Sequence, residues 1–191
     1  MKIVWLSLVF CSVLLATPSH VLADQEIAPF PYVTAAEMGR YYFKLVPGEG
    51  RDESKGAVGT CYKVEAKGND NILWATNDWY AFTVFLSVDG QYLVRLGNWP
   101  RGHAPSADHL AVAFYKKGEL LKSYSTRDLI KDVAAVRPSV SHYTFYTGKP
   151  TFVSTYNGGS FTLTSVDNIT YQFNIATGEI ISQSKTENIV K

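Results

Sequence analysis

The stretch FTVFLSVDGQYLVRL (residues 82–96) places a glycine-containing turn between two apolar runs. The same order recurs in AVAFYKKGELLKSY (residues 111–124) and in YQFNIATGEIIS (residues 171–182). Each turn contains a glycine that can supply the positive φ required by a type I turn followed by a bulge; these are Gly90, Gly118 and Gly178. We therefore expect three β-hairpins in a chain built mainly of antiparallel strands.

Hydrophobic periodicity separates buried strands from half-exposed ones. Residues 79–86 and 110–115 are nearly all apolar, which predicts central strands buried on both faces. Residues 92–96 and 171–175 alternate between apolar and polar positions, which predicts strands buried on one face. In the last of these, a register slip of one residue would bury Gln172 and Asn174, so the pattern fixes its pairing.

Further short strands and one helix complete the expected fold. The expected strands are residues 41–46, 60–66, 72–76, 143–146, 151–155 and 161–166. A helix is expected over residues 126–133, capped by Ser125 or Thr126 and stopped before Pro138. Eleven or twelve strands with one short helix predict a mostly β protein. Its antiparallel meanders and hairpins would form a sandwich, an open barrel or a partial propeller-like stack.

The composition along the chain predicts one β-rich domain, residues 41–185, with extensions at both ends. Residues 1–23 resemble a signal peptide, and residues 24–40 form a leader with one helical turn. The pattern Thr34-Ala-Ala-Glu37 has the form of a capping box for that turn. The polar tail, residues 186–191, is expected to fray.

The first residues carry the features of an export signal. Lys2 is followed by an apolar run from residue 3 to residue 15, and Val-Leu-Ala precedes Asp24, so we expect cleavage after Ala23. The alternative is an uncleaved membrane anchor, but the apolar run is shorter than the roughly 20 residues that a spanning helix needs. We therefore expect an exported protein with no membrane span after cleavage.

Cysteine content excludes a disulfide scaffold. Of the 2 cysteines, one lies in the predicted signal, which leaves Cys61 and no intramolecular disulfide. Alternation in TCYKVEA places Cys61 on the more polar face of its strand, beside Lys63 and Glu65. We expect an inert, half-covered thiol; the alternative is an intermolecular disulfide or a reactive thiol.

The charge distribution argues against nucleic acid as a partner. The formal net charge is +1, and basic residues do not gather into a run interleaved with aromatic residues. The aromatic share of 14% suits the half-buried surfaces of a β-sheet protein.

Four segments together carry a family resemblance. They are FLSVDGQYLVRLGNW, LAVAFYKKGELLKSYSTRDLI, RPSVSHYTF and YQFNIATGEII, which span most of residues 79–182. In this order they resemble a diffuse group of exported bacterial β-rich proteins of unknown function, and their hairpin turns resemble those of propeller blades. The resemblance implies a bacterial β-domain in the periplasm or outside the cell. It implies no activity and no functional residues.

The loop of residues 97–109, between the two predicted central strands, is the best candidate site, because long loops on rigid sheets commonly carry function. Its candidate binding residues are Trp99, Arg101, His103, Asp108 and His109. His103, Asp108 and His109 are possible zinc or iron ligands, although their spacing matches no zinc motif. The alternative is that His109 pairs with Asp108 or with solvent at the start of a strand, while Trp99 packs on the rim of the sheet.

Catalytic signatures are weak. There is no G-x-S-x-G turn, no phosphate-cradling loop and no dinucleotide fingerprint, so no cofactor is expected. His142, beside Ser139 and Ser141, is either a base or a hydrogen-bonded surface histidine. Asn168 begins the tripeptide Asn-Ile-Thr, which is a glycan acceptor only in a eukaryotic secretory pathway.

These observations favour a non-catalytic binding module or an envelope-associated structural module over an enzyme. The expected partner is an envelope protein or a glycan, reached through the aromatic loop or a free sheet edge. The alternative is a metal-assisted or acid–base hydrolase that uses the loop histidines together with His142.

Overall fold

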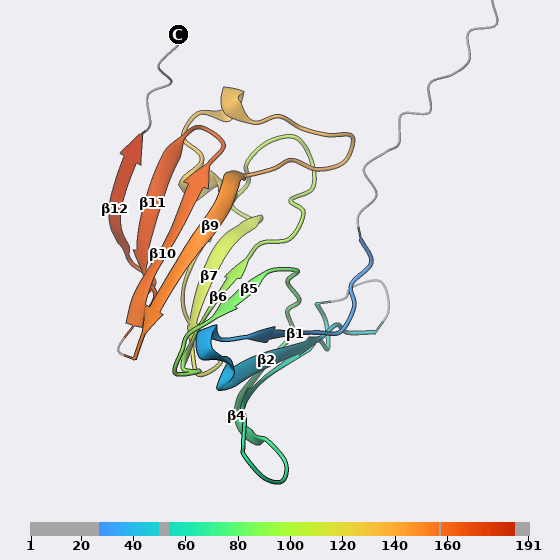
Figure 1. Ribbon diagram of the computed structural model, residues 1–191. Coiled ribbons are helices and arrows are strands. Elements are labelled where there is room, and N and C mark those ends of the chain that lie inside the picture. Colours follow the sequence, from blue (N-terminus) through green and yellow to red (C-terminus); the bar gives the residue numbers. More distant parts are fainter. Residues whose placement is uncertain (1–26, 50–53, 157, 186–191) are drawn as a thin grey trace, which may run out of the picture.

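The computed structural model describes residues 27–49, 54–156 and 158–185. Within them the chain forms three antiparallel sheets of four strands, and each sheet is a meander of consecutive strands (Figure 1). The predicted signal peptide, its cleavage point, Asn157 and the tail from residue 186 lie outside the described residues. The expected fold class, mostly β with antiparallel meanders and one short helix, is confirmed.

The strands follow one another along the chain without crossovers. The first sheet contains β1 (Tyr32–Ala35), β2 (Tyr41–Val46), β3 (Val58–Lys63) and β4 (Asn71–Asn77). The second contains β5 (Val84–Leu86), β6 (Tyr92–Leu96), β7 (Leu110–Lys116) and β8 (Glu119–Ser125). The third contains β9 (Tyr146–Thr155), β10 (Gly158–Ser165), β11 (Ile169–Asn174) and β12 (Ile180–Lys185).

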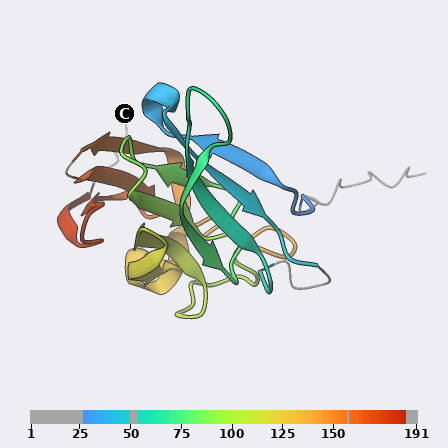
Figure 2. The same cartoon turned by 90° about the horizontal axis from the view of Figure 1, so that it is seen from below.

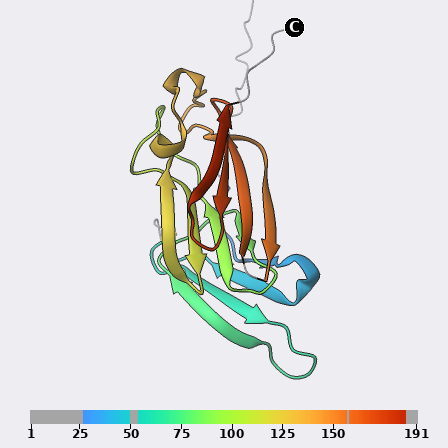
Figure 3. The same cartoon turned by 90° about the vertical axis from the view of Figure 1, so that its left-hand side faces the viewer.

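The second sheet is the middle layer of the stack. One apolar core packs it against the third sheet, and a second core packs its other face against the first sheet (Figures 2 and 3). Alternation along β6 and β7 serves both cores: Val94 and Phe114 belong to the first of these cores, whereas Leu93 and Ala113 belong to the second. A strand in such a layer needs apolar residues at consecutive positions, because neither face meets water.

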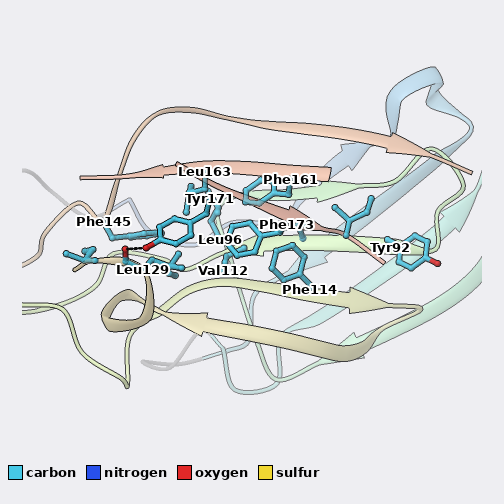
Figure 4. Packing of buried hydrophobic residues seen from close by; sticks show 14 of the residues in the cluster. Tyr92, Leu96, Val112, Phe114, Leu129, Phe145, Phe161, Leu163, Tyr171 and Phe173 are labelled. Atoms are coloured by element: carbon cyan, nitrogen blue, oxygen red, sulfur yellow. Dashed lines mark hydrogen bonds between the residues drawn. The ribbon is translucent and has the colours of Figure 1, made fainter. Parts of the chain in front are cut away.

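The core between the second and third sheets is largely aromatic (Figure 4). Phe114 of β7 and Phe173 of β11 are fully buried, with ring centroids 5.1 Å apart. Tyr171 is also fully buried, and its hydroxyl donates to the Leu129 carbonyl at 2.8 Å, which satisfies a polar group inside the core (Figure 4). Face-to-face packing of sheets therefore holds the stack together.

All three predicted hairpins form, and their glycines have positive φ of 68° at Gly90, 86° at Gly118 and 73° at Gly178. The β7–β8 turn differs in type from the expected one. Lys116 pairs with Glu119, and both residues between them, Lys117 (φ 48°) and Gly118, have positive φ. Two central residues with positive φ make a type I′ turn, which matches the twist of the strands.

Two expectations about the second sheet were wrong. The predicted central strand over residues 79–86 narrows to β5, which lies at the edge of its sheet, and β6 and β7 are the central strands. Strand β6 was expected to be buried on one face, but Leu93 and Val94 are both buried. The apolar run of 79–86 instead reflects burial of non-strand residues such as Trp79 and Tyr80 against the first sheet.

The predicted helix is shorter than residues 126–133. Helix α1 covers Thr126–Leu129, and a 3-10 turn follows at Val133–Ala135. Ser125 is the N-cap and forms a complete capping box with Asp128, as its position before the helix predicts. The helix ends where Leu129 and Ile130 turn into the core.

The segment before residue 41 contains a strand that was not predicted. Strand β1 pairs with β2, and Thr34 lies within it opposite Phe43, so Thr34 does not cap the following turn. The helical turn itself is present as a 3-10 turn at Glu37–Gly39, with Ala36 as N-cap and no side-chain cap.

Cys61 lies on the face opposite to the one expected. Its side chain is fully buried in the core between the first and second sheets, whereas Val64 is exposed. Burial, helped by the charge of Asp89, raises the pKa of the thiol to about 12, which opposes the reactive-thiol alternative. Cys61 forms no disulfide within the described residues.

No helix among the described residues is long and apolar enough to cross a membrane.

Candidate functional site

The candidate loop, residues 97–109, meets a second loop that precedes β9. Arg101 and His142 form an isolated antiparallel bridge. Beside it, the backbone amide of Gly102 donates to the Ser141 carbonyl at 3.0 Å, and the backbone amide of Tyr143 donates to the Pro100 carbonyl at 3.1 Å. Figure 1 shows both loops at the same end of the stack, so two segments far apart in sequence together make the surface there.

Two hollows lie on either side of residues 96–100. The first, which we call the aromatic hollow, has a volume of about 520 Å³. Its main aromatic lining residues are Phe82, Trp99, Tyr143, Phe145 and Tyr146. The second, which we call the Arg95 hollow, has a volume of about 410 Å³ and includes Arg95, Asp78, Arg101, Asp108 and His109 in its lining. Trp99 lines both hollows and forms part of the wall between them.

Trp99 is held in place by Asn98, its neighbour in sequence, and by His142, its neighbour in space. The Asn98 side chain accepts a hydrogen bond from the Phe82 amide at 3.0 Å and donates to the Tyr80 carbonyl at 2.9 Å. The ring of His142 packs against the Trp99 ring edge to face, with centroids 4.5 Å apart. A half-buried indole fixed in this way presents a prearranged surface to a ligand.

His109 is tied to the core through Tyr143. Its Nδ1 lies 3.0 Å from the Tyr143 hydroxyl, which also lies 2.7 Å from the hydroxyl of Thr126 at the start of α1. The alternative interpretation paired His109 with Asp108 or solvent, but His109 contacts Tyr143 and Asp108 interacts with Ser106. The bond orients the His109 ring and engages one of its two nitrogens.

Arg95 is the unusual side chain of the site. It projects from β6 toward the first sheet, and its Cζ lies 4.5 Å from the centroid of Trp79 and 5.7 Å from that of Tyr115. Its Nε is buried without a hydrogen-bond partner among the described residues. Burial lowers the pKa of the guanidinium, although an arginine remains charged at neutral pH.

The predicted site residues are only partly brought together. Arg101, Asp108 and His109 line the Arg95 hollow and Trp99 lines both hollows, whereas His103 is exposed and lines neither. Within the described ranges, no group of three or more His, Cys, Asp or Glu side chains is placed to hold a metal ion.

The two remaining candidates, His142 and Asn168, lie outside residues 97–109 in sequence, and His142 contacts that loop. His142 is buried rather than a surface histidine: its ring packs edge to face with Trp99 and lines the aromatic hollow. Its Nδ1 lies 3.4 Å from the Ser139 and Ser141 hydroxyls. Asn168 is half-buried in the β10–β11 turn with φ 63°, and its backbone amide donates to the Ser165 carbonyl.

Sequence reasoning missed Arg95, Asp78 and the aromatic residues that precede β9. Arg95 was assigned to the exposed face of a one-sided strand. Its one signal depends on the fold, because an arginine within YLVRL becomes unusual only when the strand is known to be buried on both faces. Tyr143 and Phe145 carried no such signal, since only the fold brings them beside Trp99.

Comparison with known proteins adds no family to this geometry. No protein-family model matches the chain, and no curated protein matches it.

Proposed function

We propose that the chain is an exported, non-catalytic binding domain that holds a glycan in the aromatic hollow. The observation that carries this proposal is the fixed Trp99 ring in the wall of a hollow of about 520 Å³. Pockets of this size, lined by aromatic side chains with a few polar groups, are typical of small-ligand sites.

The chemistry of the lining favours a sugar ring. A sugar presents C–H groups on its faces and hydroxyl groups around its rim. The ring of Trp99 offers an apolar face for stacking, and Thr83 and Thr144 place exposed hydroxyl-bearing side chains along the same hollow. A peptide partner with an aromatic side chain would use the same surface, and the experiment below separates the two.

The hydrolase alternative would use the three histidines together, but no one hollow contains all three. His109 contacts Tyr143 and lines the Arg95 hollow, His142 packs against Trp99 in the aromatic hollow, and His103 lies outside both hollows. A binding role requires a rigid, shaped surface rather than a base held against a nucleophile, and the interlocked loops supply such a surface.

The test measures binding of neutral oligosaccharides built from glucose, galactose or N-acetylglucosamine, by calorimetry and tryptophan fluorescence. We expect at least one series to bind, and Trp99→Ala to weaken its affinity by tenfold or more, about 1.4 kcal/mol. The matched control is Tyr156→Ala, which removes an exposed aromatic side chain that lines neither hollow.

Mass spectrometry of the recovered oligosaccharide completes the test. An unchanged mass is expected for a binding domain, and shortened products would instead indicate a hydrolase. Failure of all the series to bind, with an aromatic peptide retained in a Trp99-dependent way, would replace the glycan with a protein partner.

Export is a separate part of the proposal. It rests on the features of residues 1–23 and predicts Asp24 as the first residue of the exported chain. N-terminal sequencing of protein recovered outside the cytoplasm checks this prediction, and an intact Met1 there would contradict it.

A further inference from the structure

Within the part of the chain that the structure describes, the Arg95 cation in the Arg95 hollow has no counter-ion. The described ion pairs Lys63–Glu65 and Lys122–Glu179 do not involve Arg95. On its side of β6 the neighbours of Arg95 are the buried apolar side chains of Leu93 and Ala113, together with Tyr115. A largely buried charge is ordinarily paired and hydrogen-bonded, because removal from water is costly.

Two aromatic rings compensate only part of that cost. Trp79 and Tyr115 lie 4.5 Å and 5.7 Å from Cζ, so they interact with the face of the guanidinium. The N–H donors of a guanidinium lie in its plane and point outward from its edge, so stacking leaves them available. Arg95 lines the hollow, so a ligand that enters can meet this edge.

The remaining charged groups of the hollow lie nearer its rim. Asp78 and Asp108 are exposed: Asp78 accepts a hydrogen bond from the Gly56 amide at 3.0 Å, and Asp108 interacts with Ser106. Arg101 is also exposed, whereas Arg95 is half-buried. Arg95 is therefore the deepest charged group, and the carboxylates of Asp78 and Asp108 would repel a highly charged anion as it enters.

We infer that the Arg95 hollow is a subsite for a single carboxylate, bound by the edge of the Arg95 guanidinium. A carboxylate matches the planar fork of arginine with two parallel hydrogen bonds. It also brings one negative charge past Asp78 and Asp108, where phosphate would bring nearly two. The occupant would accept hydrogen bonds from the terminal Nη donors of Arg95, because the Nε is enclosed by the protein.

The position of this subsite specifies the ligand further. Both hollows share residues 96–100 as a wall, so one molecule can reach across Trp99 from the aromatic hollow to Arg95. This part of the inference rests on the proposed glycan binding. It identifies the ligand class as an acidic saccharide, with a sugar ring against Trp99 and the carboxylate of a uronic acid at Arg95.

The decisive comparison is between galacturonate oligosaccharides and their neutral galactose counterparts. We expect the wild-type chain to bind the acidic series at least tenfold more tightly, and Arg95→Met to abolish that preference while leaving the neutral affinity unchanged. Arg95→Lys should restore only part of it, because a lysine cannot form the bidentate contact. Equal preference in wild type and Arg95→Met would overturn the inference.

A second measurement tests the carboxylate site without any sugar. The arginine Nε–H resonances are recorded by NMR during titration with acetate, and the Arg95 signal is assigned by its absence in Arg95→Met. We expect acetate to shift this signal and methyl acetate, its neutral ester, to leave it unchanged. An equal shift with inorganic phosphate at matched concentration would contradict selection of a carboxylate.

These arms keep the two proposals apart. If neutral oligosaccharides bind through Trp99 but neither acetate nor galacturonate affects Arg95, the carboxylate subsite is wrong and the proposed function stands. If no oligosaccharide binds while acetate still shifts the Arg95 signal, the glycan is wrong and the carboxylate subsite stands. Thermal unfolding of Arg95→Met verifies that the variant is folded, since removal of an unpaired buried charge should not destabilise it.

Discussion

The hydroxyl of Tyr143 lies 3.0 Å from Nδ1 of His109, so a buried phenol anchors the end of the candidate loop. The same hydroxyl contacts Thr126 at 2.7 Å. Tyr143→Phe removes both hydrogen bonds without changing the shape of the core, and we expect it to lower the free energy of unfolding by about 1–2 kcal/mol. Urea denaturation measures the change.

The control for this substitution is Tyr146→Phe. Tyr146 is half-buried and its hydroxyl makes no hydrogen bond within the described part of the chain, so its removal should alter stability by less than about 0.5 kcal/mol. Equal losses in the two variants would mean that the Tyr143 hydroxyl does not hold the loop.

Gly118 provides a test of how the first and second sheets pack. A Cβ at this position would lie 2.4 Å from the carbonyl oxygen of Ala75 in β4, and its φ is +86°. Gly118→Ala therefore combines backbone strain with a clash between sheets, and we expect it to cost about 2–4 kcal/mol of unfolding free energy. Thermal and urea unfolding both report the loss.

Gly68 is the matched control, because it has nearly the same φ of +83° but nothing within 4 Å of the added Cβ. Gly68→Ala should lose only the strain, about 1–2 kcal/mol. The difference between the two variants isolates the sheet contact, and identical losses would show that the β7–β8 turn does not press on β4.

Cys61 should be chemically silent in the folded protein. Burial, followed by the charge of Asp89, raises the pKa of the thiol from 9.0 to about 12, and its Sγ contacts the Gly90 carbonyl at 3.5 Å. In a Cys11→Ser background we expect iodoacetamide at pH 8 to leave the native protein unmodified and to label it fully in urea. Native labelling at the unfolded rate would contradict the buried position.

The raised pKa of Cys61 also predicts alkaline destabilisation. The protonated thiol is favoured in the folded state, so its contribution is present below the unfolded pKa of 9.0 and is lost as the pH rises toward 12. Cys61→Ala lacks a titrating group, so the fall in its stability over this range should be smaller than that of the wild type.

The strand order of this protein is largely readable from local signals, whereas the layer order is not. Positive φ at Gly90, Gly118 and Gly178 depends on turn chemistry close in sequence, and all three hairpins were predicted. Whether a strand is covered on one face or two depends on which sheets stack, and alternation in residues 92–96 carries no record of a third layer. Cys61 was misplaced for the same reason: only the stack decides which face of β3 is inside.

The candidate site also contains residues that could be predicted from the sequence and residues that only the fold reveals. The loop of residues 97–109 was predicted from its length and composition, and Trp99 lies in the wall shared by both hollows. Arg95 was missed because its isolation is a property of the fold: a lone arginine in a strand is ordinary until both faces prove to be buried. His103 illustrates the converse, since closeness in sequence to His109 does not bring it to either hollow.

Asp167 is expected to give the protein an acid-sensitive contact. It is buried, and its Oδ2 accepts hydrogen bonds from the amides of Lys131 at 2.7 Å and Asp132 at 2.9 Å, while Ser165 donates to Oδ1. Burial alone would raise the pKa of this carboxyl, but these donors together lower it below 3.8. The carboxylate therefore fastens the segment after α1 to the β10–β11 turn.

The sign of the pH dependence follows from the lowered pKa. The stabilisation is present above about pH 3.8, where the unfolded carboxyl is also ionised, and is lost as the pH falls through the folded pKa. We expect Asp167→Asn to cost about 2–3 kcal/mol of unfolding free energy at pH 7, because an amide cannot accept all three hydrogen bonds as a carboxylate does.

Urea denaturation from pH 7 to pH 2 should show the gap in unfolding free energy between wild type and variant narrowing below pH 3.8. Glu119→Gln, at an exposed strand end, should follow the wild type throughout. A gap that stays constant into strong acid would mean that the Asp167 charge does not hold the turn.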